Sequence, residues 1–221
     1  MAENLDKEKS MFEYSGELSG EPEINISGHI GGFGICSNGI CETVDVASNT
    51  IIAGPYSFEK CENLTRVNIG ENVSITGNNS FLRCSSLTTL DASNGLRLFG
   101  NGTFSRCGFR VLVIPKGTII DGNYSFGQCP HLDSVVIEDG VVIIGNNTFN
   151  DCSRLSIVRI GNGVKFLGDR TFANCERLET LRIGNYVSIL GENNFSGCRN
   201  ISTRMHGDNL EFTDESFIRN A

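Results

Sequence analysis

The chain has 221 residues, a formal net charge of −8 at pH 7 and a pI of about 4.9. This acidic balance argues against nucleic acid or an anionic membrane surface as the main partner, because phosphate groups are bound by basic surfaces. The 26 glycines, four prolines and 39% hydrophobic residues are typical of a turn-rich globular protein, and no apolar run approaches the roughly 18 residues of a membrane-inserted helix.

Residues 1–40 are predicted to form an N-terminal tail and cap. The first 20 residues are charged and polar, and they lack the basic segment followed by an apolar segment that is typical of a secretory signal. We therefore expect a cytoplasmic protein if the chain is complete, or a cell-surface or secreted protein if a signal has been removed. Ile24, Ile26 and Ile30 alternate within a Gly-rich stretch, which predicts short strands and tight turns.

From residue 41 to residue 217, one pattern of 22 or 23 residues recurs. Its most regular position is a phenylalanine, found at Phe58, Phe81, Phe104, Phe126, Phe149, Phe172, Phe195 and Phe217. A cysteine follows three residues later at Cys61, Cys84, Cys107, Cys129, Cys152, Cys175 and Cys198. A glycine stands four residues before the phenylalanine at Gly54, Gly77, Gly100, Gly122, Gly145, Gly168 and Gly191. A fixed period of this length predicts a solenoid in which equivalent positions lie above one another.

Each repeat contains two strand patterns. Val67 and Ile69 alternate with polar residues, and Val73 and Ile75 alternate again after a turn. The turn position holds residues that tolerate a positive φ, with Tyr186 as the exception. The members of this turn position are Asn72, Gly95, Gly117, Gly140, Gly163 and Tyr186. Residues 41–217 are therefore predicted to be a mainly β solenoid of seven to eight coils with parallel sheets, and residues 218–221 end its C-terminal cap.

The repeat unit C-x-x-L-x-x-V-x-I-x-x-x-V-x-I-x-G-x-x-x-F resembles the BspA-like leucine-rich repeats, also called the treponemal class. The Phe-x-x-Cys-x-x-Leu step carries the resemblance, which covers about residues 41–217 and leaves the first 40 outside. The chain departs from the class in having proline after the first strand only at Pro115. The resemblance implies a right-handed, curved leucine-rich-repeat solenoid with the first strand on the concave face. Proteins similar to this one are often surface adhesins or interaction modules rather than enzymes.

The nine cysteines raise the question of zinc or disulfides. Seven of them occur once per coil, so they should form a file with a spacing of about 4.8 Å. Such a file lacks the paired ligands that tetrahedral zinc requires, and an odd number of equivalent thiols has no natural pairing. We interpret the file as buried packing residues and expect no metal or cofactor. Cys36 and Cys41 lie outside the file and are either a disulfide or free thiols.

Two other features are interpreted as structural. Asn-x-Ser/Thr sequons occur at Asn25, Asn63, Asn72, Asn78, Asn101, Asn123, Asn146, Asn194 and Asn200. Four of them fall in the same turn of successive coils, so we interpret these asparagines as turn residues rather than glycosylation sites. The three histidines, His29, His131 and His206, are far apart in the stack, and the GHIGGFG segment at residues 28–34 lacks the strand and helix of a dinucleotide site. We therefore expect no catalytic site.

Two outward columns of the first strand give a candidate binding surface. Val111, Val113, Val136 and Ile157 form an apolar patch flanked by Arg159 and Arg182, and apolar clusters rimmed by charge often mark binding sites. The predicted partner-binding residues are Val111, Val113, Ser134, Val136, Ile157, Arg159, Thr180 and Arg182. The leading hypothesis is a non-enzymatic module that recognises a protein or glycan through the concave sheet. The alternative is a structural or adhesive component whose solenoid is a spacer or attachment domain, with the valines there only because β-branched residues suit strands.

Overall fold

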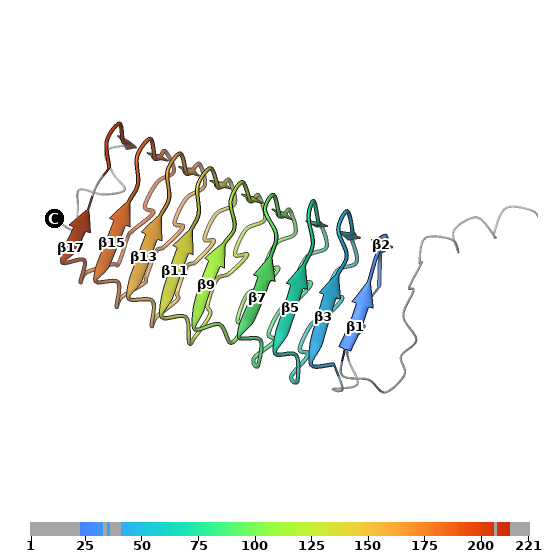
Figure 1. The fold of residues 1–221 in the computed structure, drawn as a ribbon. Coiled ribbons are helices and arrows are strands. Elements are labelled where there is room, and N and C mark those ends of the chain that lie inside the picture. Colours follow the sequence, from blue (N-terminus) through green and yellow to red (C-terminus); the bar gives the residue numbers. More distant parts are fainter. Residues whose placement is uncertain (1–22, 33–34, 36–40, 206, 213–221) are drawn as a thin grey trace, which may run out of the picture.

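The computed structural model describes residues 23–32, 35, 41–205 and 207–212. It shows an elongated stack of coils whose 18 strands all pair in parallel (Figure 1). No helix occurs among these residues, and therefore none that could cross a membrane. The prediction of a mainly β, parallel solenoid is confirmed.

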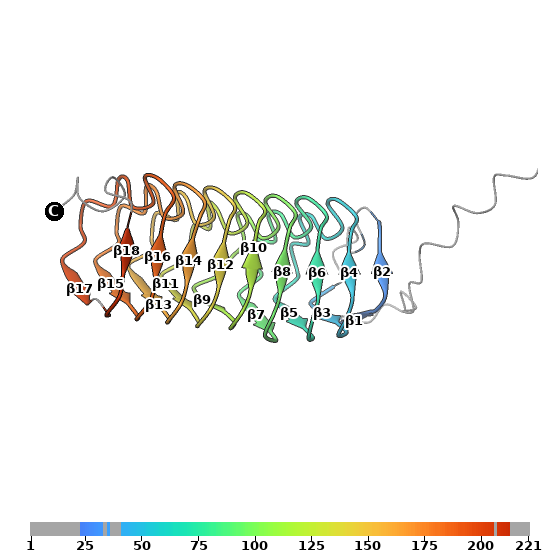
Figure 2. The same cartoon turned by 90° about the horizontal axis from the view of Figure 1, so that it is seen from above.

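Each coil contributes one long strand to the front of the stack and one two-residue strand to the back. The front strands are β1 (Glu23–Ile26), β3 (Thr43–Val46), β5 (Arg66–Ile69), β7 (Thr89–Ala92), β9 (Val111–Ile114), β11 (Ser134–Ile137), β13 (Ile157–Ile160), β15 (Thr180–Ile183) and β17 (Thr203–Met205). The back strands are β2 (His29–Ile30), β4 (Ile51–Ile52), β6 (Ser74–Ile75), β8 (Arg97–Leu98), β10 (Ile119–Ile120), β12 (Val142–Ile143), β14 (Lys165–Phe166), β16 (Ser188–Ile189) and β18 (Glu211–Phe212). Figure 2 shows the back strands as a single row from β2 to β18.

The ends of the stack follow the same register as its middle. β1 pairs with β3 and β2 pairs with β4, so residues 23–30 continue both sheets as a further coil. The predicted tail residues Met11, Phe12 and Tyr14, and the last predicted repeat positions around Phe217, lie outside the described residues. Both views show a stack with little bend, so we refer to the face formed by the long strands as the front sheet rather than as a concave face (Figures 1 and 2).

The interior contains a continuous column of phenylalanine rings. Successive rings from Phe58 to Phe195 stack with interplanar angles of 4° to 13°, and their centroids are 4.7 to 5.4 Å apart. Phe109 occupies the leucine position of its coil and packs edge-on against Phe104, with a centroid distance of 6.1 Å. All of these rings are buried. A coil on its own could not enclose its phenylalanine, so each coil depends on its neighbours for its core.

The turns between strands are held by side-chain ladders. The Oδ1 atom of Asn101 accepts a hydrogen bond of 2.8 Å from the backbone N–H of Asn123, and Asn123 in turn accepts one of 2.7 Å from Asn146. This confirms that these asparagines are turn residues. The turn position that Asn72 occupies in its coil has a positive φ in each of the predicted coils. Tyr186, the expected exception, also adopts this conformation, with a φ of 57°.

The front sheet is interrupted once, between β7 and β9. It consists of a four-stranded and a five-stranded part, whereas the back sheet continues through all nine strands. In the other coils, the residue after the front strand donates its N–H to the preceding strand, as Glu138 does to the Ile114 carbonyl at 3.0 Å. Pro115 occupies this position after β9 and has no N–H. The missing donor and the coil that is one residue short account for the break, which the sequence analysis did not predict.

Candidate interaction surface

The predicted surface residues lie on the outer face of the five-stranded part of the front sheet. Val111 pairs in register with Ser134, Val113 with Val136, and Val136 with Arg159. The columns read from the sequence are therefore columns in the structure. Among the four apolar residues, Val111 and Val113 are the most exposed, at 59% and 42%, while Val136 and Ile157 are half-buried. The patch is therefore centred on β9, with Arg159 and Arg182 exposed on its C-terminal side.

Two shallow grooves border this patch. One, of about 380 Å³, is lined by Val136, Arg159 and the turn from Glu138 to Asp139. The other, of about 480 Å³, lies at the break in the front sheet and is lined by residues that include Leu90, Val113 and Pro115. The interrupted pairing thus produces a recess next to the most exposed valines. A surface with apolar side chains and adjoining recesses can interlock with the side chains of a partner.

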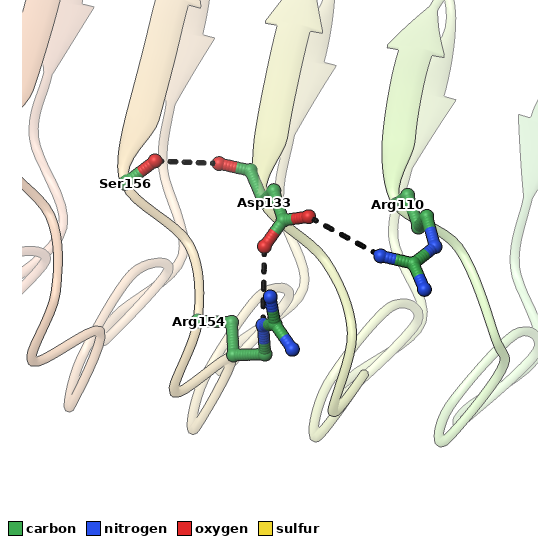
Figure 3. Close-up of polar contacts among 4 residues, drawn as sticks. All are labelled: Arg110, Asp133, Arg154 and Ser156. Carbon is green, nitrogen blue, oxygen red and sulfur yellow. Dashed lines mark hydrogen bonds and ion pairs between the residues drawn. The ribbon is translucent and has the colours of Figure 1, made fainter.

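A charged cluster borders the patch at the start of the same strands. Asp133 lies between Arg110 and Arg154, with N–O distances of 3.9 and 3.2 Å, and the Ser156 hydroxyl donates a hydrogen bond of 3.1 Å to the Asp133 carbonyl (Figure 3). Because all three charged side chains are substantially exposed, these ion pairs contribute little to stability. This cluster was not predicted from the sequence, although Arg110 and Asp133 stand directly before β9 and β11.

A second apolar row lies at the back of the stack and was also missed. Ile144, Leu167 and Leu190 occupy equivalent positions directly after β12, β14 and β16, and about 40% of each side chain is exposed. Phe99 holds the same position after β8. The signal was present in the sequence, since each residue directly precedes the glycine of the repeat. Because these side chains are apolar and exposed like Val113, substitutions in this row can serve as controls for substitutions in the front sheet.

The cysteine file is part of the core. The seven column cysteines and Cys41 are buried free thiols, whereas Cys36 lies outside the described residues. The Cys84 thiol donates a hydrogen bond of 3.1 Å to the Phe58 carbonyl, and Cys152 donates one of 3.4 Å to the Phe126 carbonyl. A hydrogen-bonded contact with Cys107, together with burial, raises the pKa of Cys84. The column cysteines are therefore buried packing residues, as the repeat spacing predicted.

The two histidines that the structure describes lie in different coils. His29 lies on β2 and His131 lies before β11, both of them exposed, and His206 is outside the described residues. Within the described ranges, no group of three or more histidine, cysteine, aspartate or glutamate side chains could hold a metal ion. Within these ranges, the front sheet is the candidate site.

Comparisons with known proteins agree with this repeat architecture. The sequence profile of the BspA type leucine rich repeat region matches residues 24–129 and 118–221, so it also includes the segment before residue 41 that we expected to lie outside the resemblance. A solved leucine-rich repeat protein from T. pallidum is 24% identical with a TM-score of 0.57, and the match covers 84% of this chain and 86% of that one. A leucine-rich repeat protein from Bacteroides ovatus is 20% identical with a TM-score of 0.54, and the match covers 87% of this chain and 64% of that one. These likenesses concern the fold alone. No curated protein matches the sequence.

Proposed function

Because the chain belongs to the family of BspA-type leucine-rich repeat proteins, we propose that it is a non-enzymatic recognition module that binds a protein partner through its front sheet. The observation that carries the proposal is the exposed apolar centre formed by Val111 and Val113, next to the exposed Arg159 and Arg182. Protein interfaces typically combine an apolar core with a polar rim, and arginine is enriched in them.

A protein suits this surface better than a glycan. The side chains at the centre of the patch are aliphatic, and the charged groups lie around them rather than among them. Isolated valines on a strand would need no explanation, but here they adjoin a recess in an otherwise continuous sheet. The alternative function, a spacer or adhesive component, draws its support from the uninterrupted nine-stranded back sheet, which gives the stack its length.

The test is a pair of charge substitutions at the centre of the front sheet. We expect Val113→Asp combined with Val136→Asp to abolish partner capture from the protein's native surroundings, because a partner would have to bury two unpaired carboxylates. Captured protein is quantified by mass spectrometry, with the wild type as bait in parallel. Circular dichroism and the thermal midpoint establish that the variant is folded.

The matched control places the same charges on the back row. Ile144→Asp combined with Leu167→Asp should leave capture unchanged, since both side chains are exposed on the opposite sheet. Capture that survives the front-sheet variant contradicts the proposal. If the back-row variant then loses capture, binding occurs through the back sheet; if neither does, the spacer function is favoured.

A further inference from the structure

Charge is distributed unevenly along the front sheet. The outward residues of β1 to β7 include three carboxylates and one guanidinium, whereas those of β9 to β15 include two guanidiniums and no carboxylate. The first set is Glu23, Asn25, Thr43, Asp45, Arg66, Asn68, Thr89 and Asp91, and the second is Val111, Val113, Ser134, Val136, Ile157, Arg159, Thr180 and Arg182. Along the solenoid axis, the face is therefore acidic, then apolar, then basic.

The acidic half has more negative charge than its own residues neutralise. Asn68 donates a hydrogen bond of 2.5 Å to Asp45, and Arg66 forms an ion pair with Asp91. Glu23 lies against Asp45, and the hydrogen bond and repulsion between the two carboxyl groups raise the pKa of Glu23. A groove of about 390 Å³, lined partly by Asp45 and Asp91, runs along this half. The half is suited to receive cationic side chains.

The basic half has the opposite imbalance. Arg159 and Arg182 pair in register on β13 and β15, so two guanidinium groups of equal charge lie side by side. Both are exposed, and neither forms an ion pair within the described part of the chain. An anionic surface would relieve their mutual repulsion.

We propose that the front sheets of two copies of this chain bind each other face to face, with their solenoid axes antiparallel. The inference rests on the proposed function, because it names the protein that the front sheet recognises. A two-fold axis parallel to the strands and midway between β9 and β11 exchanges β9 with β11 and β7 with β13. Val113 then faces Val136 of the second copy, and Asp91 faces Arg159. Such an isologous pairing satisfies each contact twice.

The dimensions of the face indicate a weak dimer. Under this symmetry the strands from β3 to β17 of each copy face each other. With a spacing of about 4.8 Å and a length of about 13 Å, they give a face of about 500 Å² per copy, or about 1,000 Å² in total. This is the lower end for a specific interface, where association is reversible. Because the charged pairs are at the rim of the apolar centre, the association should weaken as salt is added.

The test is an exchange of charges between two variants, followed by sedimentation velocity at several concentrations and low salt. Arg159→Asp alone and Asp91→Arg alone should each weaken self-association at least about tenfold, because like charges then face each other twice across the two-fold axis. An equimolar mixture of the two variants should associate to within about threefold of the wild type, because the mixed dimer has one native pair of Asp91 with Arg159 and one pair with both charges reversed. Ile144→Asp on the back row is the control and should leave the wild-type association unchanged.

A wild type that sediments as a monomer at every concentration overturns the inference, and so does a mixture that associates no better than either variant alone. These results leave the proposed function intact if Val113→Asp with Val136→Asp still abolishes capture of another protein. A different result would overturn both the face-to-face arrangement and the role of the front sheet. In that result, Arg159→Asp and Asp91→Arg each still dimerise like the wild type, and Ile144→Asp does not.

Discussion

Phe104→Ala should lower the free energy of unfolding by about 3–5 kcal/mol, the range for removing a buried phenylalanine ring from a core. The Phe104 ring is fully buried and stacks between Phe81 and Phe126, with centroid distances of 4.9 and 5.4 Å. It lies in the coil of β7, directly before the break in the front sheet. Across this break the front sheet contributes no strand pairing, so the back sheet, the hydrogen bonds between turns and the core connect the two parts of the stack. A cavity here therefore weakens the junction between two halves of a repeat array. The measurement is urea unfolding followed by circular dichroism.

Phe99→Ala is the control for this prediction. Phe99 is only five residues away, but it is 42% exposed on the back of the stack, so we expect a smaller loss of about 1 kcal/mol. The difference between the unfolding free energies of the two alanine variants gives the contribution of the stacked phenylalanine rings. Equal losses for Phe99 and Phe104 would show that the ring column contributes nothing special to stability.

Gly122→Ala should destabilise the protein by about 3 kcal/mol, at the upper end of the cost of overpacking. A Cβ atom at this position would lie 2.0 Å from the Gly100 carbonyl oxygen and 2.5 Å from its carbon. Both are backbone atoms of the preceding coil, so no side chain can move aside. The coil cannot retreat either, because the N–H groups of Asp121 and Gly122 donate to the Leu98 carbonyl at 2.8 and 3.1 Å. The thermal midpoint and urea unfolding report the loss.

Gly140→Asn separates this steric effect from the general cost of replacing a glycine. Gly140 has a φ of 67°, and a Cβ atom there would meet nothing within 4 Å. Asn72 occupies the same turn position three coils earlier with a φ of 55°, and asparagine tolerates this conformation. The asparagine variant should therefore stay within about 1 kcal/mol of the wild type. A Gly122→Ala variant as stable as Gly140→Asn would mean that the coils are not in backbone contact at the glycine column.

Much of this fold could be predicted because a repeat assigns one environment to each position. The phenylalanine and cysteine positions recur at the coil period, so their columns had to be buried and aligned, and both are. The front-sheet residues followed from the alternation of the strand, which placed Val111 and Val113 outside and Leu112 inside. Curvature did not follow from the sequence, because it depends on small differences between the widths of the two sheets.

The features that were missed arise where one coil differs from the next. Pro115 was noted as a departure, but its effect depends on which carbonyl the missing N–H would have reached, and that requires the register of both strands. The ion pairs of Asp133 join residues from three successive coils, so no local motif signals them. Leu167 and its equivalents share a recognisable position directly before the repeat glycine, but their outward direction depends on the contact of that glycine with the preceding coil.

The distribution of charge along the front sheet can be described only once the strands are placed in order. Asp91 and Arg159 are 68 positions apart in the sequence, yet both are exposed in the same outward column of the front sheet. Whether such a face binds a different protein or a second copy depends on its symmetry. That symmetry can be judged once the order of the strands is known.

The central claim is that each coil lengthens the stack by one strand spacing of about 4.8 Å, so that equivalent residues form straight columns. Distances between spin labels, measured by pulsed EPR, test this claim most directly. Spin labels are placed on a Cys36→Ser background at Glu211→Cys and, in turn, at Arg97→Cys, Ile51→Cys or His29→Cys, which share one outward column of the back sheet. The native column thiols are buried and should not be labelled. The expected distances are about 24, 34 and 38 Å, for separations of five, seven and eight strands. Distances that do not increase with the number of intervening coils would contradict the account.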